Sequence, residues 1–174
     1  MTKIIKLRHE LHQYPEVSNN EYKTSERITN FIKPLLPDEI VPLGKTGKAF
    51  IFKGKEPGST SVFRAELDAL PIQEKSTASY ISVNQQVAHM CGHDGHMAIL
   101  AGLAQKIALQ PPKYGKVVLL FQPAEEVEQG ARDVVDNPAF KKLKPDYVFA
   151  LHNIPGIEKH NIVMKSGSFS AASK

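Results

Sequence analysis

Helical periodicity marks the first part of the chain. Apolar residues recur at helical spacing over residues 3–13, and this pattern stops before Pro15. A second helix is expected over residues 21–36, where Pro34 and Pro37 disturb or end its last turn. The pattern therefore predicts two helices before the first strand.

Shorter apolar runs predict strands further along. Residues 48–53 and 61–67 are expected to form two strands, with a turn at residues 55–58 between them. The continuous apolar runs at residues 117–121 and 147–151 are typical of strands that are covered on both faces. These runs predict a sheet with a buried centre.

The remaining segments alternate between loops and helices. Residues 72–90 have no clear period and are expected to form a long loop or a short hairpin, and long structureless connections are often functional in compact domains. A buried helix is predicted over residues 96–109, before Pro111, and a short one over residues 130–135. One more strand is expected to begin at residues 162–165.

Strands that alternate with helices predict an α/β fold, with three αβα layers and a mostly parallel or mixed sheet. In such sheets, sites gather beyond the carboxyl ends of the strands. The segment His89–His96 opens the buried helix, and polar side chains follow three of the predicted strands: Asp68, Gln122–Glu126, and His152 with Asn153. We expect these groups to converge.

Composition supports a folded protein without a membrane-spanning segment. The 174 residues suit one domain, or one domain and a fragment of a second, and 41% are hydrophobic while 23% are charged. This argues against a disordered chain. No apolar run approaches the roughly 20 residues that span a bilayer. Arg8, His9 and Glu10 interrupt the region where a signal peptide would be apolar.

Charge and cysteine content narrow the cellular setting. The single cysteine excludes an internal disulfide, so a cytoplasmic location is expected. The 22 basic residues are scattered, and no aromatic residues lie among the one cluster that Lys141, Lys142 and Lys144 form. We interpret this cluster as a solvated loop, and nucleic acid is not an expected partner.

The segment His89–His96 is the strongest chemical signal. Its eight residues hold three histidines, one cysteine and one aspartate, all of which can bind divalent transition metals. Gly92 and Gly95 allow the backbone to turn these side chains towards one centre. The alternatives are a polar loop that happens to hold histidines, or a His96 that only caps the following helix.

Other candidate groups are weaker when they are taken alone. Glu125 and Glu126 are neighbours whose side chains diverge, so that one could bind a metal and the other could take a proton from water. A solvated acidic turn is the alternative. His152 could be a structural histidine at a strand end, and Asp68 could be a turn residue instead of a carboxylate that orients an imidazole.

Cys91 also allows a thiol nucleophile with a nearby histidine as its base. A nucleophile needs one base, however, whereas several imidazoles and carboxylates crowd this cysteine, and no oxyanion hole is evident. The sequence also lacks the motifs of serine hydrolases, P-loop proteins and dinucleotide-binding proteins. A ligand is therefore favoured over a nucleophile.

Five motifs follow one another along the chain: Leu7–Glu16, Arg64–Ile72, His89–His96, Phe121–Glu126 and Leu151–Gly156. Together they resemble the motifs of the M20-type metallopeptidases, and most closely those of their amidohydrolase branch. This branch includes hippurate hydrolases, N-acetyl-diaminopimelate deacetylases and auxin-conjugate amidohydrolases. The resemblance extends from residue 5 to about residue 170.

The resemblance implies a role for each matching residue. It implies two divalent metal ions, manganese or zinc, with nickel or cobalt as further options, and a small N-acyl amino acid as the substrate. Glu125 would be the general base in amide hydrolysis, and Asp68 would support the site from behind the ligands. The implied metal ligands are Cys91, His93, Glu126 and His152, whereas Asp94 and His96 match motif positions without an assigned role.

The family pattern also includes a later histidine ligand and an inserted lid and dimerisation domain, through which the complete enzyme can form a homo-oligomer. His9, His12 and His160 do not lie in the context of that later ligand. We therefore expect residues 1–174 to form the N-terminal part of the catalytic domain. The alternative to an active hydrolase is a non-catalytic fragment that folds and binds at most one metal. Self-association through exposed apolar surface is also expected.

Overall fold

The first two helices form where the periodicity predicts them. The computed structural model describes residues 1–158 and 160–167, and its first helix, α1 (Lys3–Gln13), is capped by the Thr2 side chain, which accepts a hydrogen bond from the Ile5 amide. The second helix, α2 (Tyr22–Ile32), continues as a short 3₁₀ turn, η1 (Lys33–Leu35), because Pro34 cannot extend an α-helix.

In the described part of the chain, five strands form one mixed sheet in the order β1-β2-β4-β3-β5. The pairs β1/β2 and β2/β4 are antiparallel, whereas β3 is parallel to both β4 and β5. This arrangement confirms the predicted α/β fold class. The strands are β1 (Glu39–Leu43), β2 (Gly47–Lys53), β3 (Glu56–Glu66), β4 (Tyr114–Gln122) and β5 (Tyr147–Ala150).

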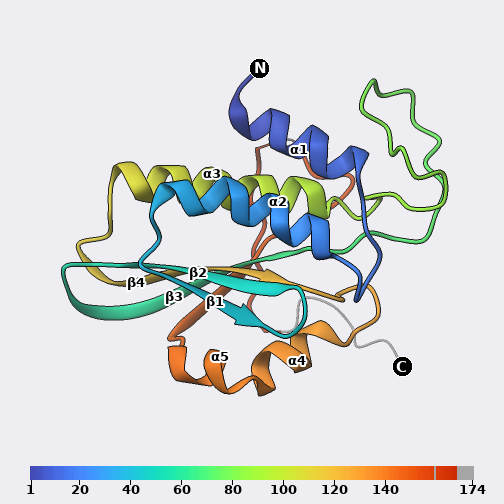
Figure 1. Cartoon of the computed structure of the whole chain (residues 1–174). Coiled ribbons are helices and arrows are strands. Elements are labelled where there is room, and N and C mark those ends of the chain that lie inside the picture. The colour runs from blue at the N-terminus through green and yellow to red at the C-terminus, as the bar shows by residue number, and fades with distance from the viewer. Residues whose placement is uncertain (159, 168–174) are drawn as a thin grey trace.

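Helices cover both faces of the sheet, as Figure 1 shows. One face carries α1, α2 and the long helix α3 (His93–Leu109). The other carries the short helices α4 (Gly130–Asp136) and α5 (Pro138–Leu143). Helix α3 begins three residues earlier than the sequence predicts, at His93, which places that histidine on its first turn. Among the described residues, no helix is long and apolar enough to cross a membrane.

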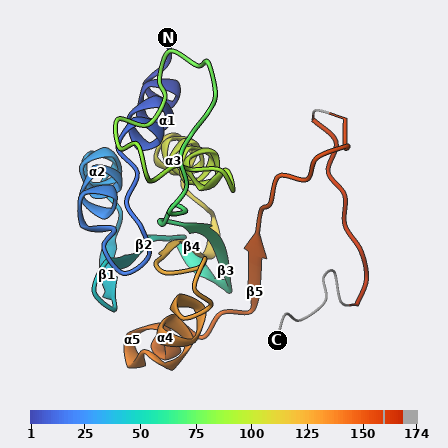
Figure 2. The ribbon, with the colours of Figure 1, turned by 90° about the vertical axis from the view of Figure 1, so that its right-hand side faces the viewer.

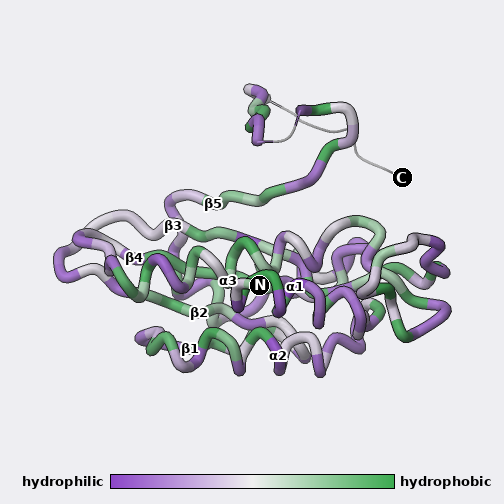
Figure 3. Tube along the Cα trace, turned by 90° about the horizontal axis from the view of Figure 1, so that it is seen from above, coloured by the Kyte–Doolittle hydropathy of each residue, from purple (hydrophilic) through white to green (hydrophobic). Residues whose placement is uncertain are grey.

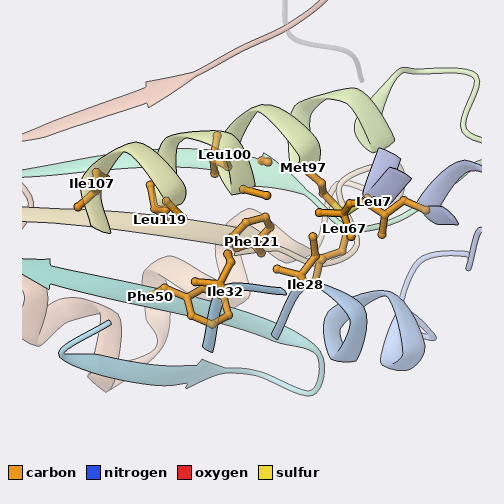
Figure 4. Packing of buried hydrophobic residues seen from close by; sticks show 14 of the residues in the cluster. Leu7, Ile28, Ile32, Phe50, Leu67, Met97, Leu100, Ile107, Leu119 and Phe121 are labelled. Atoms are coloured by element: carbon orange, nitrogen blue, oxygen red, sulfur yellow. The ribbon is translucent and has the colours of Figure 1, made fainter. Parts of the chain in front are cut away.

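Strand β4 explains why its run of apolar residues is continuous. Successive side chains of a strand point to opposite faces, and here both faces are covered. Leu119 and Phe121 pack in the cluster beneath α3 that Figure 4 shows, whereas Val118 and Leu120 pack in a second cluster with residues of α4 and α5. The predicted double coverage of this strand is confirmed.

Two segments near the start of the sheet differ from the prediction. Strand β1 was not expected, because it is a short edge strand that contains Pro42, whose missing N–H is tolerated at a sheet edge. The turn predicted at residues 55–58 is wrong, since β3 already begins at Glu56. The register of β3 is irregular between Glu56 and Thr60, so the intervening proline and glycine sit in an irregular part of the strand.

The interpretation of the lysine cluster as a loop is also wrong in part. Lys141 and Lys142 lie on α5, which begins with Pro138 at its first position. The preceding Asn137 side chain accepts a hydrogen bond from the Ala139 amide at 2.9 Å. An Asn-Pro pair is a typical helix start, and this signal could have predicted the helix.

The last strand occurs where it was predicted, but it is exposed. All four residues of β5 are exposed because the strand lies at the sheet edge, and within the described residues it pairs only with β3. Phe149 stacks on Phe63 of β3, with ring centroids 5.0 Å apart. The strand expected at residues 162–165 is absent; this exposed segment lies apart from the sheet in Figures 2 and 3.

Candidate metal centre

The three parallel strands end together, and this brings the polar motifs to one edge. Glu66, the last residue of β3, pairs in register with Gln122, the last residue of β4. Ala150, the last residue of β5, pairs with Arg64. The segments that contain Asp68, Glu126 and His152 follow these strand ends. The predicted convergence at the carboxyl edge of the sheet is therefore confirmed.

Three of the four candidate ligands form a compact donor group. The ligand atoms of Cys91, His93 and Glu126 all lie within 4.8 Å of one another. His93 Nε2 is 3.8 Å from Glu126 Oε1, and both atoms are buried without a hydrogen-bond partner among the described residues. A buried imidazole nitrogen and a buried carboxylate oxygen that face each other beside a thiol fit a divalent transition-metal ion.

The backbone near Asp68 sets the orientation of His93. The ring atom Nδ1 lies 2.8 Å from the Asp68 carbonyl oxygen, to which it donates a hydrogen bond. In the neutral ring, this leaves the lone pair on Nε2, which faces Glu125 Oε2 at 3.6 Å as well as Glu126. Metal-binding histidines are commonly fixed in this way through their other nitrogen.

Asp68 is fully buried and holds the Glu125–Glu126 turn in place. Its Oδ2 atom accepts hydrogen bonds from Ser18 Oγ at 2.7 Å and from the Glu126 amide at 2.9 Å. Burial alone would raise the pKa of Asp68, but the nearby His93 ring, whose Nδ1 lies 3.6 Å from Asp68 Oδ1, and hydrogen bonds from the Glu126 amide and Ser18 outweigh it and lower the pKa to about 2. The carboxylate is therefore ionised at neutral pH.

The two adjacent glutamates differ in their surroundings, because the side chains of neighbouring residues point in different directions. The side chain of Glu125 is 36% exposed and that of Glu126 only 16%. Burial raises the pKa of Glu126, and the charges of Glu125 and Asp68 add to this rise while His93 opposes it. Glu126 thus lies within the donor group, whereas Glu125 lies next to the group and is more exposed to solvent.

Glu21 supports the start of this turn and was not recognised from the sequence. It is fully buried, and its Oε1 accepts a hydrogen bond from the Ala124 amide at 2.8 Å. Its other oxygen accepts from Thr46 Oγ1 at 2.8 Å. A single glutamate at the start of a predicted helix carries no signal of a contact 103 residues away.

Cys91 and His152 lie next to each other. The Sγ atom of Cys91 is 3.5 Å from His152 Nε2, although His152 lies outside the compact group of three donors. Burial raises the pKa of the Cys91 thiol to about 11, and the charges of Glu126 and Glu125 add to the rise. A thiol nucleophile needs the opposite shift, so these surroundings disfavour the alternative of a cysteine nucleophile. A bound cation would supply the positive charge that the thiolate lacks here.

Both the sequence and the fold of this chain are similar to those of known proteins. The sequence model of peptidase family M20/M25/M40 matches residues 62–169. The chain belongs to this family. It is 34% identical to an N-acetyldiaminopimelate deacetylase of Oceanobacillus iheyensis over 96% of this chain and 45% of that protein. It is 35% identical to a hippurate hydrolase of Campylobacter jejuni, over 97% of this chain and 44% of that protein.

A solved structure from the same family is also similar. The Bacillus subtilis YXEP protein, described as a dinuclear metal-binding peptidase from the M20 family, superposes with a TM-score of 0.81 at 35% identity. The match covers 88% of this chain and 43% of that one. The present M20 chain thus spans less than half the length of the relatives it matches.

Several residues near the M20 site were not assigned a role from the sequence. His96 Nδ1 lies 2.9 Å from Glu66 Oε2, and His96 Nε2 lies 3.0 Å from Asn153 Oδ1. Asp94 Oδ2 lies 3.0 Å from His12 Nδ1. Glu66, His96 and Asn153 lie up to 87 positions apart in the sequence, and the placement of α3 beside the ends of β3 and β5 brings them together.

His89, the first residue of the predicted metal motif, is not one of the grouped donors. Both nitrogens of its ring are buried without a hydrogen-bond partner among the described residues. Burial lowers the pKa of His89 to about 4, so the ring is neutral at physiological pH. Its ring centroid lies 6.5 Å from that of His93, beside the site and not within it.

Proposed function

We propose that this protein is a metal-dependent amidohydrolase that cleaves the amide bond of N-acyl amino acids. In this proposal Cys91, His93, Glu126 and His152 are the metal ligands, and Glu125 is the general base. The observation that carries the proposal is a pair of buried atoms, His93 Nε2 and Glu126 Oε1, which lie 3.8 Å apart and have no hydrogen-bond partner among the residues that the structure describes.

The metal ions would supply the electrophile. Bound divalent cations polarise a carbonyl group and lower the pKa of water. Mn²⁺ and Zn²⁺ are the ions that suit a mixed thiol, imidazole and carboxylate donor set, and Ni²⁺ and Co²⁺ are further options. The YXEP protein, whose description includes a dinuclear metal site, supports two ions.

The chain's own residues would position and move the proton. Glu125 Oε2 lies 3.6 Å from His93 Nε2 and is partly exposed, so a water molecule could contact both it and the donor group. The Glu125 carboxylate would accept a proton from that water and pass it to the departing amine. Asp68 would hold two of the ligands in place, because its carbonyl oxygen accepts a hydrogen bond from the His93 ring and its carboxylate accepts one from the Glu126 amide.

The names of the relatives support the substrate class. The similar proteins include an N-acetyldiaminopimelate deacetylase, a hippurate hydrolase and an N-acetyl-L-cysteine deacetylase of Bacillus subtilis, which is 38% identical to this chain. Each name describes an acylated amino acid. A small N-acyl amino acid is therefore the substrate class that we propose.

We infer that residues 1–174 correspond to the N-terminal part of the catalytic domain of these longer relatives. The support is the coverage, which is 96% of this chain but 45% of the Oceanobacillus protein. We also propose that a further ligand completes the metal centre in the longer protein, and that the longer protein can form a homo-oligomer. The alternative, a fragment that folds and binds at most one metal, makes a different prediction for metal content.

Metal stoichiometry per chain tests the centre directly. The chain is dialysed against trace manganese, zinc, nickel and cobalt, and its metal content is measured by elemental mass spectrometry. About two ions per chain would support the dinuclear centre, and about one would favour the single-metal alternative. A chain without metal would contradict the proposed centre.

Hydrolysis of a panel of N-acetyl and N-benzoyl amino acids tests the activity. Glu125→Gln should abolish turnover and leave the metal content nearly unchanged, because Glu125 is proposed as the base and not as a ligand. Glu26→Gln, which changes an exposed glutamate on α2, is the matched control. Activity that persists in Glu125→Gln would contradict the general-base assignment.

A further inference from the structure

His152 lies on an exposed segment that makes few contacts with the rest of the fold. After β5 the chain leaves the sheet, and residues 151–157 are all exposed. Among the described residues, two hydrogen-bond contacts join this segment to the rest of the fold. Cys91 contacts His152, and His96 contacts Asn153. Without a metal ion, the position of His152 depends on these two contacts.

The His96 contact rests on a rigid base. His96 and Glu66 are both almost completely buried, and Nδ1 of the ring donates a hydrogen bond to Glu66 Oε2 at 2.9 Å. Glu66 also forms an ion pair with Arg64, whose Nε donates to Gln122 Oε1 at 2.9 Å. The ring of His96 is thereby fixed to the central strands β3 and β4.

The second nitrogen of His96 faces the amide of Asn153 at 3.0 Å. Because Nδ1–H points to Glu66, a neutral ring offers only a lone pair at Nε2. The asparagine amide matches either state of the ring, since its oxygen accepts from Nε2–H of an imidazolium and its NH₂ group donates to a neutral ring. A side chain with both a donor and an acceptor suits this position.

The backbone of the Cys91–His93 segment also lies close to the Asn153 amide. Gly92 adopts a left-handed backbone conformation with φ of 86°, and a Cβ atom on it would lie 2.4 Å from Asn153 Oδ1. Only glycine allows this close approach. The Asn153 amide thus lies between the glycine that separates two proposed ligands and the buried ring of His96.

We propose that Asn153 is a positioning residue which, held by His96 and Glu66, fixes His152 beside Cys91. The backbone supports the link, because His152 Nδ1 donates to the Asn153 carbonyl oxygen at 2.8 Å. One residue thereby sets both the place of the His152 segment and the direction of its ring, whose Nε2 atom is turned towards Cys91. This inference rests on the proposed function, since it gives Asn153 a part in holding one of the proposed ligands.

The test has one measurement without metal and one with metal. Heteronuclear ¹H–¹⁵N NOEs of residues 151–154 report the order of the segment in the metal-free chain. A Co²⁺ titration followed by visible absorption reports affinity and ligand geometry. Asn153→Leu keeps the branched side-chain shape but removes the amide, Asn153→Asp keeps an acceptor, and Asn161→Leu is the matched control on the same exposed segment.

Asn153→Leu should lower the NOEs of residues 151–154, shift the cobalt absorption bands and weaken Co²⁺ binding about tenfold to a hundredfold, as loss of a residue behind a metal ligand does. Asn153→Asp should retain the NOEs, because His96 can donate to its carboxylate, and Asn161→Leu should change neither measurement. Unchanged NOEs and unchanged Co²⁺ affinity in Asn153→Leu would overturn the inference.

The two measurements separate the inference from the proposed function. Lowered NOEs in Asn153→Leu, in a chain that binds no Co²⁺ in its unsubstituted form, would support the positioning role and contradict the metal centre. Co²⁺ binding that is equally tight in the unsubstituted chain and in Asn153→Leu, with unchanged NOEs, would overturn the positioning role and leave the metal centre in place.

Discussion

His12 Nδ1 lies 3.0 Å from Asp94 Oδ2, so α1 is joined to the first turn of α3, directly after the proposed ligand His93. The other nitrogen of His12 lies 3.0 Å from Glu74 Oε1, in the long loop of residues 72–90. One imidazole therefore joins two carboxylates from separate segments. Nearby, Arg8 Nε also donates to Asp94 Oδ2 at 3.1 Å, and His9 stacks on Tyr80 of the same loop.

This bridge predicts a pH dependence of stability. The hydrogen bond to Asp94 raises the pKa of His12, burial opposes the rise, and the hydrogen bond to Glu74 adds to it. A pKa that is higher in the folded state gives stability that is fully present below the unfolded value of about 6.5, and that is lost as the pH rises through the folded value. His12→Gln should therefore lower the free energy of unfolding most at pH 6, and by progressively less towards pH 9.

Urea unfolding of His12→Gln and the unsubstituted chain at pH 6, 7.5 and 9 measures this effect. The control is His160→Gln, which changes an exposed imidazole on the terminal segment. A difference in unfolding free energy that is constant across this pH range would show that the His12 bridge does not depend on its protonation.

Asp68→Asn should destabilise the fold by about 2 kcal/mol at pH 7. The pKa of Asp68 is about 2 in the folded protein, against a usual value of 3.8, and each pKa unit corresponds to about 1.4 kcal/mol. Because the folded pKa is the lower one, this stability is present above about pH 4 and is lost as the pH falls towards 2.

Denaturant unfolding of Asp68→Asn between pH 3 and pH 7 checks this prediction. Asp133→Asn, at an exposed position on α4, is the control. If the two variants unfold at the same urea concentration at pH 7, the hydrogen bonds from Ser18 and the Glu126 amide do not stabilise the Asp68 carboxylate.

The Cys91 thiol should react slowly with iodoacetamide in the metal-free chain. With a pKa of about 11, only about one thiol in a thousand is a thiolate at pH 8, and the thiolate is the reactive form. The alkylation rate should therefore keep rising with pH up to about pH 10, which mass spectrometry of quenched samples can follow.

Alkylation of a denatured sample provides the control for reagent activity. Rapid alkylation of the folded chain at pH 7 would contradict the raised pKa and would favour a cysteine nucleophile. In that case, a chelator should leave any hydrolytic activity unchanged, whereas the proposed metal centre requires its loss.

The exposed strand β5 should promote self-association. Val148 is 59% exposed on this edge strand, and unpaired edges with apolar side chains tend to pair with other chains. Val148→Lys should lower the sedimentation coefficient at high protein concentration and reduce the fluorescence of a bound hydrophobic dye. Lysine is the residue that natural edge strands use against such pairing.

Val135→Lys is the matched control, because Val135 is 55% exposed on α4, away from the sheet edge. Equal effects of the two substitutions would mean that general charge, and not the β5 edge, controls association. A monomeric unsubstituted chain without dye binding would contradict the prediction altogether.

The sequence predicts those features of the fold that depend on local pattern. The apolar run of β4 indicated double coverage, and the polar residues after β3, β4 and β5 indicated a common edge. The exposure of β5 was not predictable, because an apolar run does not reveal whether other elements cover it. Strand β1 was missed since a proline in a short edge strand resembles a loop.

The residues around the proposed ligands were harder to predict than the ligands themselves. Cys91 and His93 lie in one dense motif, whereas the contact between His96 and Asn153 joins positions 57 residues apart. Glu21 similarly meets the Ala124 amide across 103 residues. Such pairings depend on strand register and helix placement, and no local pattern encodes them.

The parallel pairing of β3 with β4 has a consequence for how the chain folds. Ser61 pairs with Val117, so this contact must close a loop that contains all of α3. Closing such a loop costs entropy before the strand contacts repay it, which makes this pairing a slow step. The donor group beyond these strand ends therefore forms late, and we expect refolding intermediates to contain helices before they can bind a metal ion.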